Sequence, residues 1–246
     1  MTILVTGGTK GIGLAIAKAF AEPGKLVALN YHGDDAAADA ARREVEALGA
    51  DCLVVKGDVG TPEGAAAVVA AVADRGAGLD QLVHCAVKVL PAPVLEVDPD
   101  AFTRAINLNG TAMLYLVQAA LPLMRRGSTV FFLSSRGGKV VVPNYAAVGV
   151  GKALAECLVR YLAAELAPKG IRANCVAPGM VDTAALREVF GDQTGGLLAD
   201  NAAKNPSGRG IRDEDYTAMI RYLASPAAEM VQGQVIYING GHNLSA

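Results

Sequence analysis

Short apolar runs alternate with longer alanine-rich segments along nearly the whole chain of 246 residues. The runs are too uniformly apolar for a sheet with one face in water, and each is followed by a Gly, Asp, Asn or Ser turn. We expect strands at residues 3–5, 26–29, 53–55, 81–83, 130–133, 172–176 and 235–238. We expect helices at about 12–21, 35–48, 62–74, 99–124, 144–167 and 213–224. This order predicts an α/β fold with right-handed crossovers, in which helices cover both faces of one doubly wound parallel sheet of seven strands, in a single domain over residues 1–246.

Charge and composition exclude several classes of function. The chain has 22 Lys and Arg against 24 Asp and Glu, a net charge of −2, and it has 5% aromatic residues and no Trp. A nucleic-acid-binding protein would need a basic face or stacking aromatic side chains, so we expect no nucleic-acid partner. No apolar run reaches the ~18 residues that span a membrane, and the first residues do not resemble a signal peptide, so we expect a cytoplasmic protein. The four cysteines and three histidines show no metal-ligand spacing, so we expect no metal.

One segment breaks the alternation of strands and helices. Residues 183–212 are polar and contain several glycines, and they follow the sixth expected strand. In open α/β sheets, ligands bind beyond the carboxyl ends of the strands. We therefore interpret residues 183–212, called the lid segment below, as a mobile cover over a substrate pocket rather than as a plain surface excursion.

The run TGGTKGIG at residues 6–13 lies between the first expected strand and the first expected helix. Glycines at such a turn let backbone N–H groups approach a pyrophosphate, and the helix N-terminus favours the negative charge. A glycine triplet alone is weak evidence, because a strand-to-helix turn needs glycine for structural reasons. Its position in the first βαβ unit favours a dinucleotide site.

The residues after the second strand indicate which dinucleotide is used. An acidic residue there would bind the ribose 2′-hydroxyl of NAD, but this chain has Asn30, Tyr31 and His32, with no carboxylate until Asp34. Lys10 adds a cation near the same ribose. We therefore expect NADPH (NADP⁺), although His32 is a weaker phosphate ligand than Arg and could be an ordinary loop residue.

Further motifs occur in a specific order. They are Asp58-Val59 after the third strand, Asn107 in an Ile-Asn-Leu run, Ser134-Ser135 after the fifth strand, Lys152 in the next helix, and Pro178-Gly179 and Thr183 after the sixth strand. Together with the glycine loop, they resemble the short-chain dehydrogenase/reductase family over essentially the whole chain. The resemblance implies a Rossmann fold and an NAD(P)-dependent oxidoreductase. It implies cofactor contacts from Gly7, Thr9, Lys10, Gly11, Ile12, Gly13, Tyr31, His32, Asp58, Val59, Cys85, Ala86, Lys152, Pro178, Gly179, Val181 and Thr183.

The chain departs from the family's usual catalytic motif, Tyr-x-x-x-Lys. Val148 stands four residues before Lys152, and a valine cannot donate a proton. Tyr145 stands seven residues before Lys152, and this spacing resembles the enoyl-[acyl-carrier-protein] reductases of the same superfamily. The run His-Cys-Ala-Val at residues 84–87, where most relatives have Asn-Asn-Ala-Gly, is similar to several of those reductases.

Reduction of an enoyl thioester explains why the tyrosine would be displaced. Hydride reaches the β-carbon while negative charge develops on a thioester oxygen two carbons away, so the proton donor must lie farther from the nicotinamide. Three residues along a helix move a side chain by ~4.5 Å and keep it near the lysine's face. Tyr145 would stabilise the enolate oxygen, Lys152 would bind ribose and lower the tyrosine pKa, Asn107 would order a water or the backbone, and Ser135 would orient a carbonyl or only cap a turn.

Three functions remain open at this point. The first is an NADPH-dependent reductase of the C=C bond of an enoyl thioester on acyl carrier protein or CoA. The second is a ketone or polyketide carbonyl reductase that lacks the usual tyrosine. The third is a dinucleotide-binding regulator without activity, in which Tyr145 is only a packed aromatic residue. Apolar residues on more than one face of the helices at 99–124 and 144–167 also predict a homodimer or homotetramer.

Overall fold

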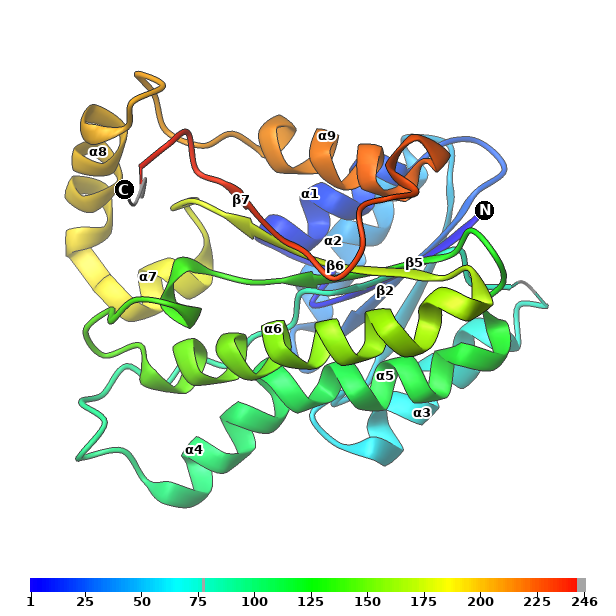
Figure 1. Cartoon of the computed structure of the whole chain (residues 1–246), viewed down its shortest axis with the longest axis horizontal. Helices are drawn as coiled ribbons and strands as arrows, with labels where there is room; N and C mark the ends of the chain where they lie inside the picture. The colour runs from blue at the N-terminus through cyan, green and yellow to red at the C-terminus, as the bar shows by residue number, and fades with distance from the viewer. Residues whose placement is uncertain (77, 243–246) are drawn as a thin grey trace.

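Seven parallel strands form one twisted sheet at the centre of the molecule (Figure 1). The computed structural model describes residues 1–76 and 78–242. The strand order is β3-β2-β1-β4-β5-β6-β7, so the chain reverses direction across the sheet between β1 and β4. The strands are β1 (Thr2–Thr6), β2 (Leu26–Tyr31), β3 (Asp51–Lys56), β4 (Gln81–His84), β5 (Thr129–Leu133), β6 (Arg172–Pro178) and β7 (Val235–Ile238). The predicted fold class and all seven strand positions are confirmed.

Helices cover both faces of the sheet. They are α1 (Gly11–Phe20), α2 (Asp35–Glu46), α3 (Pro62–Ala73), α4 (Pro99–Ile106), α5 (Ala112–Ala120), α6 (Ala146–Leu166), α7 (Ala184–Phe190), α8 (Thr194–Lys204) and α9 (Asp213–Ala224). The core on one face is formed by α3, α5 and α6, and the core on the other face by α1, α2 and α9. The strands are buried between these two layers, which explains their continuously apolar sequences. No helix in the described part of the chain is long and apolar enough to cross a membrane.

Two regions differ from the sequence expectation. The helix expected at 99–124 is interrupted by a π-helical turn at Asn107–Thr111, which separates α4 from α5. The lid segment contains helices α7 and α8, and the sequence analysis placed no helix there. Several of its glycines lie at helix ends. Gly191 follows α7 with a φ of 53°, and Gly195 and Gly196 lie in the first turn of α8, where an added Cβ would meet no atom within 4 Å. The composition indicated a break in the βα order, but not the two short helices that fill it.

Candidate active site at the carboxyl ends of the strands

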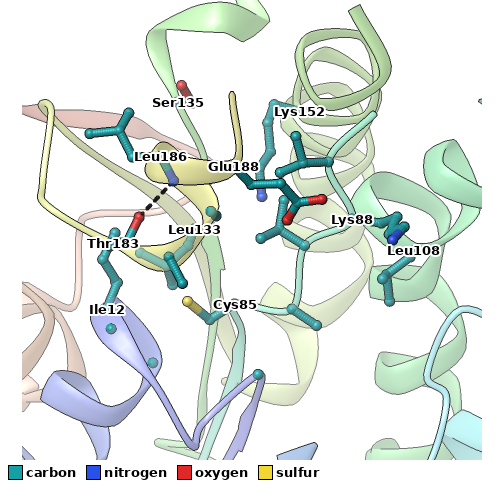
Figure 2. Close-up of a pocket in the computed structure, with 18 of the residues that line it drawn as sticks. Ile12, Cys85, Lys88, Leu108, Leu133, Ser135, Lys152, Thr183, Leu186 and Glu188 are labelled. Atoms are coloured by element: carbon teal, nitrogen blue, oxygen red, sulfur yellow. Dashed lines mark hydrogen bonds between the residues drawn. The ribbon is translucent and has the colours of Figure 1, made fainter. Parts of the chain in front are cut away.

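The carboxyl ends of the strands open into one pocket of about 1200 Å³. Every residue that the sequence assigned to the cofactor or to catalysis lines this pocket. Figure 2 shows side chains from the glycine loop, the strand ends, α6 and the lid segment converging on it, with Lys152 opposite Cys85 and Thr183. The fold therefore gathers the predicted residues, and their roles remain proposals.

Backbone packing shapes the glycine loop. Gly7 has a φ of 61° and Gly11 a φ of 48°, in the left-handed region that favours glycine. A Cβ on Gly7 would lie 2.8 Å from the Cα of Ala86, and a Cβ on Gly13 would lie 2.2 Å from the carbonyl oxygen of Gly7. This close packing leaves the N-terminus of α1 open to the pocket, which suits the pyrophosphate of a dinucleotide.

His84 links the glycine loop to the π-helical turn. Its Nε2 lies 2.9 Å from the Leu108 carbonyl oxygen, and its Nδ1 lies 2.7 Å from the Thr6 hydroxyl. A carbonyl only accepts, so Nε2 carries the proton and Thr6 donates to Nδ1. Burial, assisted by the charge of Lys152, lowers the pKa of His84 to about 3. His84 is thus a neutral structural residue that holds β1 against the turn containing Asn107.

Charged residues surround the expected position of the adenosine ribose. Lys10 forms an ion pair with Asp34, whose side chain also accepts a hydrogen bond from the backbone N–H of Ala37 at 2.9 Å. The hydrogen bond from Lys10 is the largest cause of the lowered pKa of Asp34. Lys10, His32 and Asp34 all line the pocket. A 2′-phosphate could therefore be bound by Lys10 only in competition with Asp34.

The Tyr145 phenol and the Ser135 hydroxyl both line the pocket and interact there. Burial raises the pKa of Tyr145, and the interaction with Ser135 opposes this change. Ser135 also accepts a hydrogen bond from the backbone N–H of Gly137 at 3.3 Å, so it caps a turn and contacts the tyrosine. Ser135 therefore does more than cap a turn, because its hydroxyl also interacts with Tyr145, the predicted proton donor.

Two backbone features position the Tyr145 ring. Tyr145 precedes the first residue of α6, as the N-cap, rather than lying in the first helical turn as expected. Asn144 before it has a φ of 58°, in the left-handed region that Asn tolerates. The ring lies against Gly137, where a Cβ would come 2.7 Å from two ring carbons. The conformation of Asn144 and the missing side chain of Gly137 therefore determine where the phenol points.

Lys152 is 5% exposed, and its Nζ lies 4.5 Å from the centroid of the Phe132 ring. Burial lowers its pKa to about 8, and the nearby Cys85, Cys175 and Glu156 oppose this shift. Val148, which replaces the family's usual tyrosine, is 1% exposed and packs in the protein interior rather than on the pocket wall. Tyr145 is thus the tyrosine that the structure brings to Ser135.

The π-helical turn carries Asn107 to the pocket wall. The backbone N–H of Ala112 donates to the Asn107 carbonyl, which widens the helix at this point. The turn packs closely on α6, because a Cβ on Gly151 would lie 2.5 Å from the Cβ of Asn109. Asn109 donates to the Ala147 carbonyl at 3.0 Å. These contacts fasten the turn to the helix that carries Lys152.

The chain matches the family model described as "Enoyl-(Acyl carrier protein) reductase" over residues 7–243. The protein belongs to the short-chain dehydrogenase/reductase superfamily. It is 30% identical to the 1-cyclohexenylcarbonyl-CoA reductase of Streptomyces collinus, over 99% of this chain and 87% of the relative. It is 31% identical to a 3-oxoacyl-[acyl-carrier-protein] reductase of Staphylococcus aureus, over 97% of this chain and 96% of the relative.

Solved structures of short-chain dehydrogenases/reductases have the same fold. The NADP complex of RhlG from Pseudomonas aeruginosa is 32% identical to this chain, with a TM-score of 0.87 over 99% of this chain and 96% of that one. A short-chain dehydrogenase from Burkholderia cenocepacia in complex with NADP is 27% identical, with a TM-score of 0.87 over 98% and 97% of the two chains. The protein is therefore an NAD(P)-dependent oxidoreductase of this superfamily.

The sequence analysis missed several residues that shape the site. Gly137 and Asn144 position the tyrosine ring, and Tyr237 and His242 line the pocket from the C-terminal strand and the segment after it. A sequence signal existed for the first two, since an Asn after Pro and a glycine pair after a strand both indicate an unusual turn. No such signal marked Tyr237, because its pocket contact depends on the packing of β7 beside β6.

Proposed function

We propose that this protein reduces the C=C bond of an enoyl thioester and uses NADPH as the hydride donor. The observation that carries the proposal is that Tyr145, Ser135 and Lys152 line one pocket, while Val148 is buried away from it. A tyrosine seven residues before the lysine, rather than four, supports protonation of an enolate oxygen rather than of the carbonyl that receives hydride. The 1-cyclohexenylcarbonyl-CoA reductase relative, whose name denotes this chemistry, supports the proposal.

The cofactor site fits a dinucleotide. Side chains at Gly7 and Gly13 would collide with backbone atoms, so the glycine loop is packed as a cradle of N–H groups. The loop and the N-terminus of α1 would hold the pyrophosphate, and Lys152 would hold the nicotinamide ribose. When bound, NADPH supplies the hydride. We propose NADPH over NADH because Lys10 and His32 line the adenosine end, and the NADP complexes of related proteins support this choice.

The residues of this chain would stabilise the charge that forms after hydride transfer. Tyr145 would donate a hydrogen bond to the developing enolate oxygen and then transfer its proton there, and the resulting enol would tautomerise to the saturated thioester. Ser135 would orient the phenol. Lys152, when protonated, favours the phenolate that results. The His84 hydrogen bond to Leu108 would keep the turn that carries Asn107 in place at the pocket. We also propose that acyl carrier protein or CoA carries the acyl group. We further propose that the protein forms a homodimer or homotetramer.

A carbonyl reductase is the second candidate. Ser135 stands at the position that orients the substrate carbonyl in carbonyl-reducing relatives, and the chain is 31% identical to a 3-oxoacyl-[acyl-carrier-protein] reductase. In that case Tyr145 or a water molecule would protonate the alcohol oxygen. The buried Val148 counts against this candidate, because it leaves the usual proton donor absent.

Steady-state kinetics with two thioesters would test the proposal. Crotonyl-CoA and acetoacetyl-CoA would be offered with NADPH and with NADH, and the oxidation of the cofactor would be followed by absorbance. We expect turnover of crotonyl-CoA, with a higher kcat/KM for NADPH. Turnover of acetoacetyl-CoA alone would favour the carbonyl reductase. Tight NADPH binding without turnover of either thioester or of a ketone panel would favour the regulator.

A further inference from the structure

Glu156 is a buried residue of α6 that is not among the residues lining the active-site pocket. The buried Lys, Arg, Asp and Glu side chains in the described part of the chain are Lys152, Glu156 and Arg172. Arg172 donates to backbone carbonyls at and after the end of α9, which account for its burial. Lys152 and Glu156 are four residues apart and therefore share one face of α6. A buried carboxylate is costly unless it is hydrogen-bonded and paired, so the position of Glu156 requires an explanation.

The Glu156 carboxylate is fastened to the strand end that carries Ser135. Ser134 Oγ donates to Glu156 Oε1 at 2.5 Å, and both residues are buried. Ser134 directly follows β5 and precedes Ser135. A Cβ on Gly138 would lie 3.3 Å from Glu156 Oε1 and 3.4 Å from the backbone carbonyl carbon of Lys152, so the turn after β5 packs closely on this part of α6. The hydrogen bond therefore holds the carboxylate beside the helical turn that carries Lys152.

The charge of Glu156 acts on Lys152. Burial lowers the pKa of Lys152 to about 8, and Cys85, Cys175 and Glu156 oppose this decrease. Burial also raises the pKa of the Cys85 thiol to about 11 and that of the Cys175 thiol to about 12, so both thiols are neutral where Lys152 titrates. The Glu156 carboxylate is thus the negative charge among these three groups, and an opposite charge nearby favours the protonated lysine.

The other titratable groups around Lys152 keep one charge state while the lysine titrates. On β4, burial and the charge of Lys152 lower the pKa of His84 to about 3. On β7, burial raises the pKa of Tyr237 to about 12, and at the start of α6 burial raises the pKa of Tyr145. Arg160 on α6 donates to the backbone carbonyl four residues before it at 3.0 Å and stays protonated. A change of charge at mildly alkaline pH therefore belongs to Lys152.

We propose that Glu156 is a positioning residue for Lys152: held by Ser134, its carboxylate is the fixed negative charge that keeps the lysine protonated during turnover. The inference rests on the proposed function, in which the charge of Lys152 favours the Tyr145 phenolate. Glu156 would thus set the pH range of the reaction without contact with cofactor or substrate.

The pH profile of kcat/KM would test this inference. Crotonyl-CoA would be reduced with NADPH by the parent and by Glu156→Gln, Glu156→Asp and Glu165→Gln. Glu156→Gln keeps an acceptor oxygen for Ser134 but removes the charge, so the alkaline decline should begin ~1 pH unit lower than in the parent. The ratio of parent to variant kcat/KM should therefore stay near one at acidic pH and approach ~10 at alkaline pH. Glu165→Gln changes an exposed position of the same helix and should keep the parent profile.

Two results would overturn the inference. The first is a Glu156→Gln profile whose alkaline decline lies at the same pH as in the parent, because a loss of activity that is equal at every pH indicates a structural role alone. The second concerns Glu156→Asp, which keeps the charge and should keep the decline close to that of the parent, even where its kcat is lower. A shift as large as that of Glu156→Gln would show that side-chain length, and not charge, is responsible.

Failure of the proposed function would look different, because the parent would then not reduce crotonyl-CoA. In that case the pKa of Lys152 would be measured by competitive acetylation with acetic anhydride over a range of pH, followed by mass spectrometry of the peptide that contains the lysine. A lower pKa of Lys152 in Glu156→Gln than in the parent and in Glu165→Gln would still support the inference. Equal pKa values in the three proteins would reject it.

Discussion

The two halves of the pocket are held in place in different ways. On the cofactor side, backbone contacts determine the geometry, as where a Cβ on Gly13 would lie 2.2 Å from the Gly7 carbonyl oxygen. On the substrate side, side chains and single hydrogen bonds hold the wall, as where α8 is joined to the chain after β7 through Asn201 and Asn205. Backbone packing tolerates little change, whereas side-chain contacts can vary without loss of the fold. The difference explains how one superfamily can keep its cofactor and vary its substrate.

Removal of the phenolic oxygen should have the largest effect on the substrate side. Tyr145→Phe should lower kcat and kcat/KM together by ~10²–10³, the usual cost of losing one oxyanion-hole donor, and leave the Kd of NADPH nearly unchanged. Stopped-flow kinetics and fluorescence titration of NADPH would measure the two quantities. Tyr222→Phe is the matched control, because its hydroxyl donates to the Ala227 carbonyl at 3.4 Å and Tyr222 is not among the residues that line the pocket. Nearly full activity of Tyr145→Phe on crotonyl-CoA would contradict the displaced-tyrosine mechanism.

The contrast between the halves also explains what could be predicted from the sequence. The strands were placed correctly because their apolar runs and turn residues are local signals, and the glycine loop was found because backbone geometry there demands glycine. The roles of Gly137, Tyr237 and His242 depend on which segments meet in space, which no local pattern records. Tyr145 was found only because its spacing to Lys152 resembles that of a known family. Whether it is the proton donor remains a prediction.

The next largest effect should come from moving the phenol without removing it. A Cβ in Gly137→Ala would lie 2.7 Å from two carbons of the Tyr145 ring, so the ring must shift. We expect kcat to fall ~10–10²-fold, because small misplacements of a catalytic group are costly. Gly195→Ala adds the same methyl group in open space and should leave kcat unchanged. Equal kcat values for the two variants would show that the ring position is not critical.

The pH dependence should report Lys152. Burial lowers the pKa of this lysine to about 8, so it loses its positive charge as the pH rises through that value. Without the charge, the Tyr145 phenolate is less favoured, and kcat/KM should fall ~10-fold per pH unit above the pKa. Lys152→Arg stays protonated over the whole range, so its lower activity should show no such alkaline decline. A parent profile that is flat to high pH would exclude this role.

A smaller effect should appear at the adenosine end of the cofactor side. Because Asp34 holds Lys10 in an ion pair, Asp34→Asn should free the lysine for a 2′-phosphate and raise the preference for NADPH over NADH by several-fold. Lys10→Ala should lower that preference by raising the KM for NADPH. The ratio of kcat/KM for the two cofactors would be measured for each variant. Changes of the same sign in both variants would contradict the competition between phosphate and carboxylate.

The smallest effect should be a change in hydrogen exchange within the lid segment. Cofactor and a saturated acyl thioester should slow amide exchange over residues 183–212, because ligand contacts would order helices that offer few buried apolar residues. The slowing should be greater in α7 than near residues 201–207, because the latter are already bonded to the chain after β7 through Asn201, Asn205 and Ser207. In the glycine loop, amide exchange should slow through direct contact with the cofactor alone. A measurement with NADP⁺ and no thioester would therefore separate the response of the cofactor side from that of the substrate side. Uniform protection of the lid segment by NADP⁺ alone would show that the two sides of the pocket are ordered as one unit, and the contrast between them would no longer hold.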